Sequence, residues 1–207
     1  MEEYVFENVV TSAETLAELL GRPSELAVRK EKQALDAHMR AFIEASPIAL
    51  VGTASRDGRC DVSPRGDAPG FVKILDDRTL AIPDRPGNKR FDTMRNILDT
   101  GHLGALFLIP GRTDGLRVNG RGRIVRDDGV LAMLEAQGKR PVLAIALTVE
   151  ECFLHCSKAL MRSKLWEGTP APPIASFAEM IHDQTRLEGM TLEAMERRLA
   201  EAHKTLY

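Results

Sequence analysis

The stretch LRVNGRGRIV, residues 116–125, gives the strongest indication of the fold. Small or apolar residues alternate with polar ones: the first set is Leu116, Val118, Gly120, Gly122 and Ile124, and the second is Arg117, Asn119, Arg121 and Arg123. A period of two is typical of a half-buried β-strand, so one face of this strand is expected to be covered. Glycines on the inner face also favour a tightly curved barrel wall.

Further strands are predicted along the middle of the chain. Short apolar or extended segments occupy residues 47–55, 59–64, 71–75, 79–83, 103–109 and 142–154. The Asp57-Gly58 pair is a strong hairpin signal, and Asp76-Asp77-Arg78 predicts a second hairpin. About six strands joined in this way indicate an antiparallel sheet.

Helices are predicted at both ends of the chain and once within the sheet region. Apolar residues at helical spacing mark each of them: Leu35, Met39, Phe42 and Ile43; Phe91, Met94, Ile97 and Leu98; and Leu192, Met195 and Leu199. The expected fold class is therefore α+β, with one small antiparallel barrel and flanking N- and C-terminal helices. We expect a single domain over residues 1–207, divided into helices (1–46), barrel (47–156) and helical extension (157–207).

Composition excludes several classes of protein. The 207 residues carry 28 Lys and Arg against 30 Asp and Glu, so the net charge of −2 gives no overall field for nucleic acid or an acidic membrane. No apolar run approaches the roughly 18 residues that span a bilayer. The acidic start MEEYVFENVV does not resemble a secretory signal, and three cysteines do not suggest a disulfide scaffold, so a cytoplasmic location is expected.

A candidate anion site lies in DRPGNKRFDTMRN, residues 84–96. Gly87 permits a turn, and the sequence places Asn88, Lys89 and Arg90 at what is expected to be the first turn of a helix. Cations there oppose the helix dipole unless an anion is present, and a phosphate could accept the backbone N–H groups and the side-chain donors. The alternative is two solvated surface cations. The spacings of a Walker loop and of a dinucleotide-binding loop are absent.

A second candidate segment is DVSPRGDAPGF, residues 61–71. Four of its residues disfavour regular ladder pairing: Pro64, Gly66, Pro69 and Gly70. Its free backbone groups could hydrogen-bond a flat heterocycle, while Arg65 reaches a phosphate or an electron-rich ring. The alternative is a surface loop in which Arg65 pairs with Asp61 or Asp67.

The order of these segments resembles the pyridoxamine 5'-phosphate oxidase-related FMN-binding proteins, which are split barrels. Within that family the chain is similar to a bacterial branch with a P-G-N-[NK]-R segment and an HC-x-KAL-x-RS stretch, over roughly residues 30–170. The resemblance implies an antiparallel split β-barrel of the FMN-binding type. It also implies a homodimer with FMN at the subunit interface, both chains contributing to each site.

The resemblance also assigns residues to the cofactor. It implies that Asn88, Lys89 and Arg90 hold the FMN phosphate, and that Ser63, Pro64 and Arg65 run beside the isoalloxazine ring and ribityl chain. The chain departs from true pyridoxamine phosphate oxidases, because VSPRGDA replaces their R-x-V-L-L-K strand and no basic R-x-R pair follows near the C-terminus. Oxidation of vitamin B6 is therefore not expected.

The segment ECFLHCSKALMRSKLW, residues 151–166, holds two cysteines and a histidine. On a strand His155 points away from Cys152 and Cys156, so no metal site is predicted and each cysteine is interpreted as a small buried hydrophobe. By resemblance, the stretch lies near the flavin of the partner chain. It implies three candidate second-subunit contacts: Lys158, Arg162 and Trp166. Trp166 could instead anchor a dimer core.

These patterns predict an FMN-dependent oxidoreductase of a small organic molecule, with a reduced nicotinamide as electron donor. Several alternatives remain open. The same residues would serve a flavin-binding or flavin-sensing protein without turnover. A split barrel can also hold a deazaflavin or a heme, and His155 is the one strand-borne candidate for an axial ligand of the heme iron. An oligonucleotide-binding barrel could use Arg117, Arg121 and Arg123, but aromatic residues make up 5% of the chain and none interleaves with this stripe.

Overall fold

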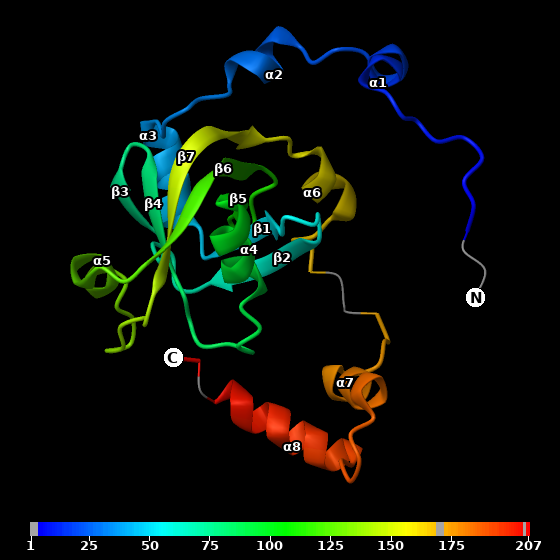
Figure 1. The fold of residues 1–207 in the computed structure, drawn as a ribbon, viewed down its shortest axis with the longest axis vertical. Coiled ribbons are helices and arrows are strands. Elements are labelled where there is room, and N and C mark those ends of the chain that lie inside the picture. The colour runs from blue at the N-terminus through cyan, green and yellow to red at the C-terminus, as the bar shows by residue number, and fades with distance from the viewer. Residues whose placement is uncertain (1–3, 169–171, 205) are drawn as a thin grey trace.

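A computed structural model describes residues 4–168, 172–204 and 206–207. Its sheet has seven antiparallel strands in the order β2-β1-β5-β6-β7-β4-β3 (Figure 1). The strands are β1 Ile48–Ala54, β2 Cys60–Gly66, β3 Lys73–Asp76, β4 Thr79–Pro83, β5 His102–Leu108, β6 Gly115–Val125 and β7 Ala144–His155. The helices are α1 Ala13–Leu20, α2 Glu25–Arg29, α3 Ala37–Ala45, α4 Asp92–Thr100, α5 Asp128–Met133, α6 Lys158–Ser163, α7 Phe177–Thr185 and α8 Leu192–His203.

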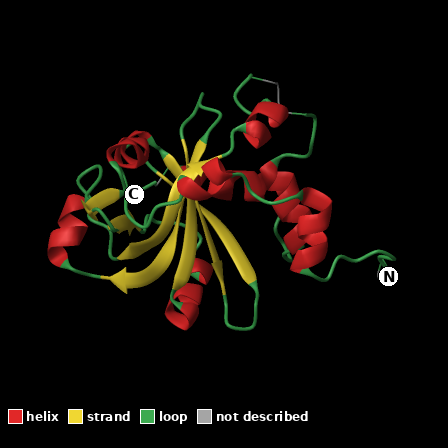
Figure 2. Ribbon diagram, turned by 90° about the horizontal axis from the view of Figure 1, so that it is seen from above, coloured by secondary structure: helices red, strands yellow, loops and turns green. Residues whose placement is uncertain are grey.

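The sheet curves into a split barrel whose two edges are β2 and β3. Figure 2 shows the strands gathered in one strongly twisted sheet with helices around it and the N-terminus well away from it. Both predicted hairpins are confirmed, since β1 pairs with β2 and β3 pairs with β4. The α+β split-barrel prediction is confirmed: about six strands were expected, and each of the seven extended segments named above contains a strand. In the described part of the chain, no helix is both long and apolar enough to cross a membrane.

The alternation predicted for β6 is confirmed. Leu116, Val118, Gly120 and Gly122 are buried, whereas Arg121 and the next arginine are exposed. The strand pairs along its whole length with β7, and the register shifts between Asn119 and Gly120. The inward glycines let neighbouring elements approach closely. β6 is therefore the central strand of the seven, and the register shift lies where its glycines allow β7 to approach.

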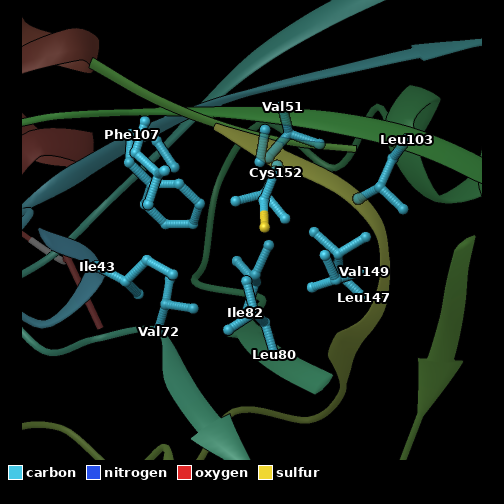
Figure 3. Packing of buried hydrophobic residues seen from close by; sticks show 14 of the residues in the cluster. Ile43, Val51, Val72, Leu80, Ile82, Leu103, Phe107, Leu147, Val149 and Cys152 are labelled. Carbon is cyan, nitrogen blue, oxygen red and sulfur yellow. The ribbon is translucent and has the colours of Figure 1, made fainter. Parts of the chain in front are cut away.

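The core fills the barrel interior from both the sheet and α3 (Figure 3). Ile43 from α3 lies beside Val72 and Phe107, and all three are at most 1% exposed. The stripe predicted on the first helical segment is confirmed, because Leu35, Met39, Phe42 and Ile43 are all buried. Met195 on α8 is buried as well. In α1 and α2, no described residue is buried, and both helices lie apart from the barrel (Figure 1).

The stripe predicted on the inner helix is only half right. Met94 and Ile97 of α4 are buried, but Phe91 is 48% exposed and Leu98 76% exposed. The helix instead buries two polar residues towards β1 and β2: Asn96 Nδ2 donates to Thr53 Oγ1 over 2.9 Å, and Thr93 Oγ1 donates to a carboxylate of β2 over 2.6 Å. Hydrophobicity alone predicted only part of the buried face, because hydrogen-bonded polar residues form the rest of it.

The three cysteines do not share one environment. Cys152 is buried, but Cys60 and Cys156 are exposed, so the expectation that each is a buried hydrophobe is wrong for two of them. Burial, together with the charges of Asp36 and Glu151, raises the pKa of the Cys152 thiol to about 11. Its Sγ also lies 3.4 Å from the carbonyl oxygen of Lys32.

We expect two of the three thiols to react with a disulfide-exchange reagent in the folded protein. Cys60 and Cys156 are accessible, whereas Cys152 is buried and stays protonated at neutral pH. The measurement is the number of protein thiols that have reacted as a function of time, in the folded protein and in denaturant. A third thiol that reacts as fast as the other two before unfolding would contradict the burial of Cys152.

Candidate functional site

A cavity of about 830 Å³ opens beside the outer edge of β2. Its walls are β2, the loop that leads into α4, the loop before β7 and the Tyr207 side chain. Six of the nine residues predicted to bind a cofactor line it: Ser63, Pro64, Arg65, Asn88, Lys89 and Arg90. The two segments that the sequence marked separately therefore meet at one cavity.

The turn before α4 is strained. Lys89 and Phe91 have φ values of 59° and 61°, in the left-handed region that side chains other than glycine avoid. Such a residue costs about 1–2 kcal/mol. The turn is fixed locally because the Arg90 backbone N–H donates to Asn88 Oδ1 over 3.1 Å. Strain of this kind accumulates at ligand-binding segments, where the surrounding structure maintains it.

The helix begins later than the sequence suggested. α4 starts at Asp92, so Lys89 and Arg90 lie in the turn before it and not in its first turn. The left-handed residues are the physical reason, because a helix cannot continue through them. The Arg90 guanidinium Nε donates to Asp92 Oδ2 over 2.7 Å, which holds this cation at the cavity.

No described side chain caps the N-terminus of α4. Within the part of the chain that the structure describes, the short helices α5 and α6 also lack a side-chain cap, whereas side chains cap the other five helices: Ser12, Ser24, Asp36, Ser176 and Thr191 at α1, α2, α3, α7 and α8. The first N–H groups of a helix need acceptors and carry the positive end of its dipole. At α4 these groups remain available at a cavity wall, where an anion can accept from them.

Strand β2 is regular, which corrects the expectation of an irregular segment. Its residues pair with β1 in continuous register, with Pro64 opposite Leu50. Proline fits here because β2 is an edge strand and needs no N–H donor on its open side. Among the described strands, only β1 neighbours β2, so the other edge of β2 faces the cavity with unpaired backbone groups.

Arg65 has a different partner from the two that the sequence suggested. Its Nη1 donates to Asp84 Oδ1 over 3.0 Å, and both side chains are less than a quarter exposed. Burial raises the pKa of Asp84, although the Arg65 charge opposes this shift. Among the described residues, the buried Arg65 Nε has no hydrogen-bond acceptor. A buried donor at a cavity is suited to an acceptor atom of a ligand.

The cavity lining carries more basic than acidic side chains. Six cations line it, Arg65, Arg85, Lys89, Arg90, Lys139 and Arg140, against the three carboxylates Asp61, Asp84 and Asp92. Sequence reasoning missed Asp84, Arg85, Lys139, Arg140 and Tyr207. The first two flank the turn that was singled out, so their position was a usable signal. The other three come from distant segments with no local pattern. In the described residues, no cluster of His, Cys, Asp and Glu could hold a metal ion.

A family model described as pyridoxamine 5'-phosphate oxidase matches residues 35–156, which is more than half of the chain. The protein belongs to the pyridoxamine 5'-phosphate oxidase family. The matched range contains the whole sheet and every wall of the cavity except Tyr207. A search of curated proteins gave no match.

Solved structures with a similar fold have low sequence identity to this chain. HupZ of Group A Streptococcus is 20% identical, with a TM-score of 0.48, over 67% of this chain and 99% of that one. A putative pyridoxamine 5'-phosphate oxidase of Lactobacillus delbrueckii is 19% identical, with a TM-score of 0.47, over 59% and 95% of the two chains. An FMN-binding protein of Syntrophomonas wolfei is 13% identical, with a TM-score of 0.42, over 68% and 95%.

Three predicted residues lie beyond the range that matches the pyridoxamine 5'-phosphate oxidase model: Lys158, Arg162 and Trp166. None of them is among the described residues that line the cavity of their own chain. Lys158 and Arg162 belong to α6, in which no described residue is buried, and Trp166 Nε1 donates to the carbonyl oxygen of Arg112 over 2.7 Å. Their assignment to the site of a partner subunit stays a prediction.

The arginine stripe on β6 is largely paired with acidic residues of β7. Arg117 Nη2 lies 3.0 Å from Glu151 Oε1, and Arg121 Nε lies 3.0 Å from Glu150 Oε1. The glutamates offset two of the three positive charges, and the third arginine, Arg123, is exposed. The geometry gives the oligonucleotide alternative no continuous basic surface.

Proposed function

We propose that the protein binds FMN in this cavity and acts as an FMN-dependent oxidoreductase on a small organic substrate, with a reduced nicotinamide as electron donor. The observation that carries the proposal is the meeting of a basic, strained turn, an uncapped helix start and an open strand edge at one cavity. A phosphate ester attached to a flat ring suits these three features together. Family membership supports the same ligand class.

The start of α4 would hold the phosphate. Asn88, Lys89 and Arg90 line the cavity beside the uncapped helix, so side-chain donors and backbone N–H groups can converge on one dianion. The dianion would offset the repulsion between the cations and the positive end of the helix dipole. It would also compensate for the strain at Lys89 and Phe91.

The edge of β2 would hold the ring. Ser63, Pro64 and Arg65 line the cavity along this edge, and the buried Arg65 Nε is a donor without an acceptor in the described chain. Bound FMN would supply hydride or electron transfer, chemistry that the protein side chains lack. Arg65 would orient the ring and stabilise negative charge on it, with Asp84 holding the guanidinium in place.

A heme at this site receives no support from the geometry. His155, the axial candidate, is exposed at the end of β7 and stacks on Phe153 with ring centroids 6.4 Å apart. Among the described residues that line the cavity there is no histidine.

We further propose a homodimer in which Lys158, Arg162 and Trp166 of one chain complete the site of the other. The lack of buried residues in α6 supports this arrangement, because the helix then has a face free for a partner. Pyridoxamine phosphate is not the proposed substrate, since VSPRGDA stands where true oxidases of the family carry R-x-V-L-L-K.

We expect the purified protein to carry a flavin absorption spectrum and to release FMN, identified by mass. FMN at 100 times its Kd stabilises a folded protein by about 2.7 kcal/mol, which raises Tm by about 5–10 °C for a chain of this size. Riboflavin should give a smaller shift because it lacks the phosphate. A colourless protein whose Tm does not respond to FMN would refute the proposal. Flavin that no nicotinamide reduces would instead indicate binding without turnover.

A further inference from the structure

Tyr207 reaches the cavity from the far end of the chain. Its backbone oxygen accepts a hydrogen bond from Lys139 Nζ over 2.7 Å, and its hydroxyl donates to Asp67 Oδ1. The Arg85 guanidinium lies over its ring, 5.5 Å from the centroid. Three separate segments therefore hold Tyr207: two contact its side chain and one contacts its backbone oxygen. The C-terminus lies close to the barrel in Figure 1. Nothing in the proposed function accounts for these contacts.

The anchor of Tyr207 is itself well fixed. Asp67 Oδ2 accepts from Arg85 Nε over 2.7 Å, and the two side chains are 4% and 16% exposed. Burial acts to raise the pKa of Asp67, but hydrogen bonds from Tyr207, the Ala68 backbone and Arg85 outweigh it, so this pKa lies below its usual value. The carboxylate is ionised at neutral pH and accepts from the phenol, and Tyr207 is one of the residues that line the cavity.

Tyr207 lies at the opposite end of β2 from the helix start. Asp61, at the beginning of the strand, accepts from Thr93 in the first turn of α4 over 2.6 Å. Asp67, directly after the strand, accepts from Tyr207. The two carboxylates are six residue steps apart along the extended chain, about 20 Å at 3.3 Å per residue. A ligand with its phosphate at α4 therefore extends along β2 towards Tyr207.

We propose that Tyr207 is a ring-contacting residue whose phenol packs against the flat ring of the ligand at the end of the cavity remote from α4. This inference rests on the proposed function, because it takes the phosphate to lie at Lys89 and Arg90. The tail of the chain thereby closes the ring end of the site. The Arg85 guanidinium over the phenol and the hydrogen bond from its hydroxyl to Asp67 fix the orientation of the Tyr207 ring.

The test compares riboflavin with FMN on the full-length protein, by titration of flavin fluorescence. A contact with the ring affects both ligands equally, so Y207A should raise Kd about tenfold for each, as expected for the loss of one stacked aromatic. Y207F keeps the ring and its packing, so Kd should change little. Phenylalanine does not quench an adjacent flavin by electron transfer as tyrosine does, and bound flavin should therefore fluoresce severalfold more strongly in Y207F. Y4A is the matched control, since Tyr4 is 80% exposed.

Each outcome decides the inference. If wild-type protein binds neither flavin, the proposed function fails and the inference fails with it. If wild-type protein binds FMN but Y207A and Y207F match it in Kd and fluorescence, only the inference is overturned. Weaker binding of FMN with unchanged riboflavin in Y207A would place Tyr207 at the phosphate and would also overturn it. The fluorescence of Y207F decides the question if Y207A does not fold.

Discussion

Replacing both Lys89 and Arg90 with alanine is expected to raise the Kd for FMN by at least about 100-fold, because each charge-assisted hydrogen bond to a phosphate contributes about 1.5–3 kcal/mol. The affinity for riboflavin should stay within about threefold of wild type, since riboflavin carries no phosphate and a factor of three is about 0.6 kcal/mol. Alanine keeps Cβ, so the left-handed backbone at residue 89 remains under the same constraint. Fluorescence titration of the two flavins measures both quantities.

The matched control is R197A/R198A. Arg197 and Arg198 are also adjacent cations, but they are exposed on α8 and do not line the cavity among the described residues. Their removal changes the net charge by the same amount and should leave the Kd for FMN unchanged. An equal loss of FMN and riboflavin binding in K89A/R90A would mean that the turn supports the fold of the cavity and not a phosphate. The salt dependence of FMN binding should also fall in K89A/R90A alone.

The barrel could be predicted because its signals are local. The alternation in residues 116–124 depends only on side chains two positions apart, and Asp57-Gly58 fixes a hairpin by the conformation of its own residues. Both patterns depend on the geometry of a strand or a turn, not on what packs against it. The sheet order β2-β1-β5-β6-β7-β4-β3 was beyond such reasoning, since it depends on which strands meet after the chain curls.

The site was predicted only in part, and the missing part is long-range. The turn around Asn88 could be located because proline and glycine mark it, but the left-handed Lys89 and Phe91 could not, as neither residue favours that conformation. The charge partners were wrong for the same reason. Arg65 pairs with a residue 19 positions away, and Asp67 with one 18 positions away, although nearer candidates exist.

Exposed apolar residues outside the barrel agree with the proposed partner subunit. Leu16, Leu19 and Leu20 of α1 are 48%, 67% and 81% exposed, and Trp166 beyond α6 is 36% exposed. Exposed apolar side chains of this size are available for burial against a partner. Lys158 and Arg162, which we propose to complete the site of a partner subunit, lie in α6, which like α1 has no buried residue among those described.

Gly120→Ala is expected to destabilise the protein by about 4 kcal/mol or more, a larger loss than the same change at Gly122 or Gly129. A Cβ at this position would lie 2.9 Å from the carbonyl carbon of Thr148 and 3.0 Å from the backbone N of Glu150, and closer still to the Thr148 carbonyl oxygen. These are backbone atoms of β7 at the register shift, so they cannot move without breaking the ladder between β6 and β7. Such a loss is a large share of the total stability of a domain.

Two other glycines set the scale for this result. At Gly122 a Cβ would meet side-chain ends, Leu103 Cδ2 at 2.6 Å and Ile97 Cγ2 at 3.1 Å, which can rearrange, so Gly122→Ala should cost about 1–3 kcal/mol. At Gly129 in α5 nothing lies within 4 Å, and Gly129→Ala should stabilise the protein by about 0.5–1 kcal/mol through its helix propensity. Urea unfolding of the three variants gives the free energies. The loss of unfolding free energy should be largest for Gly120→Ala and smaller for Gly122→Ala, while Gly129→Ala should cause none. A Gly120→Ala protein as stable as Gly122→Ala would mean that β7 does not approach β6 as closely as the structure has it.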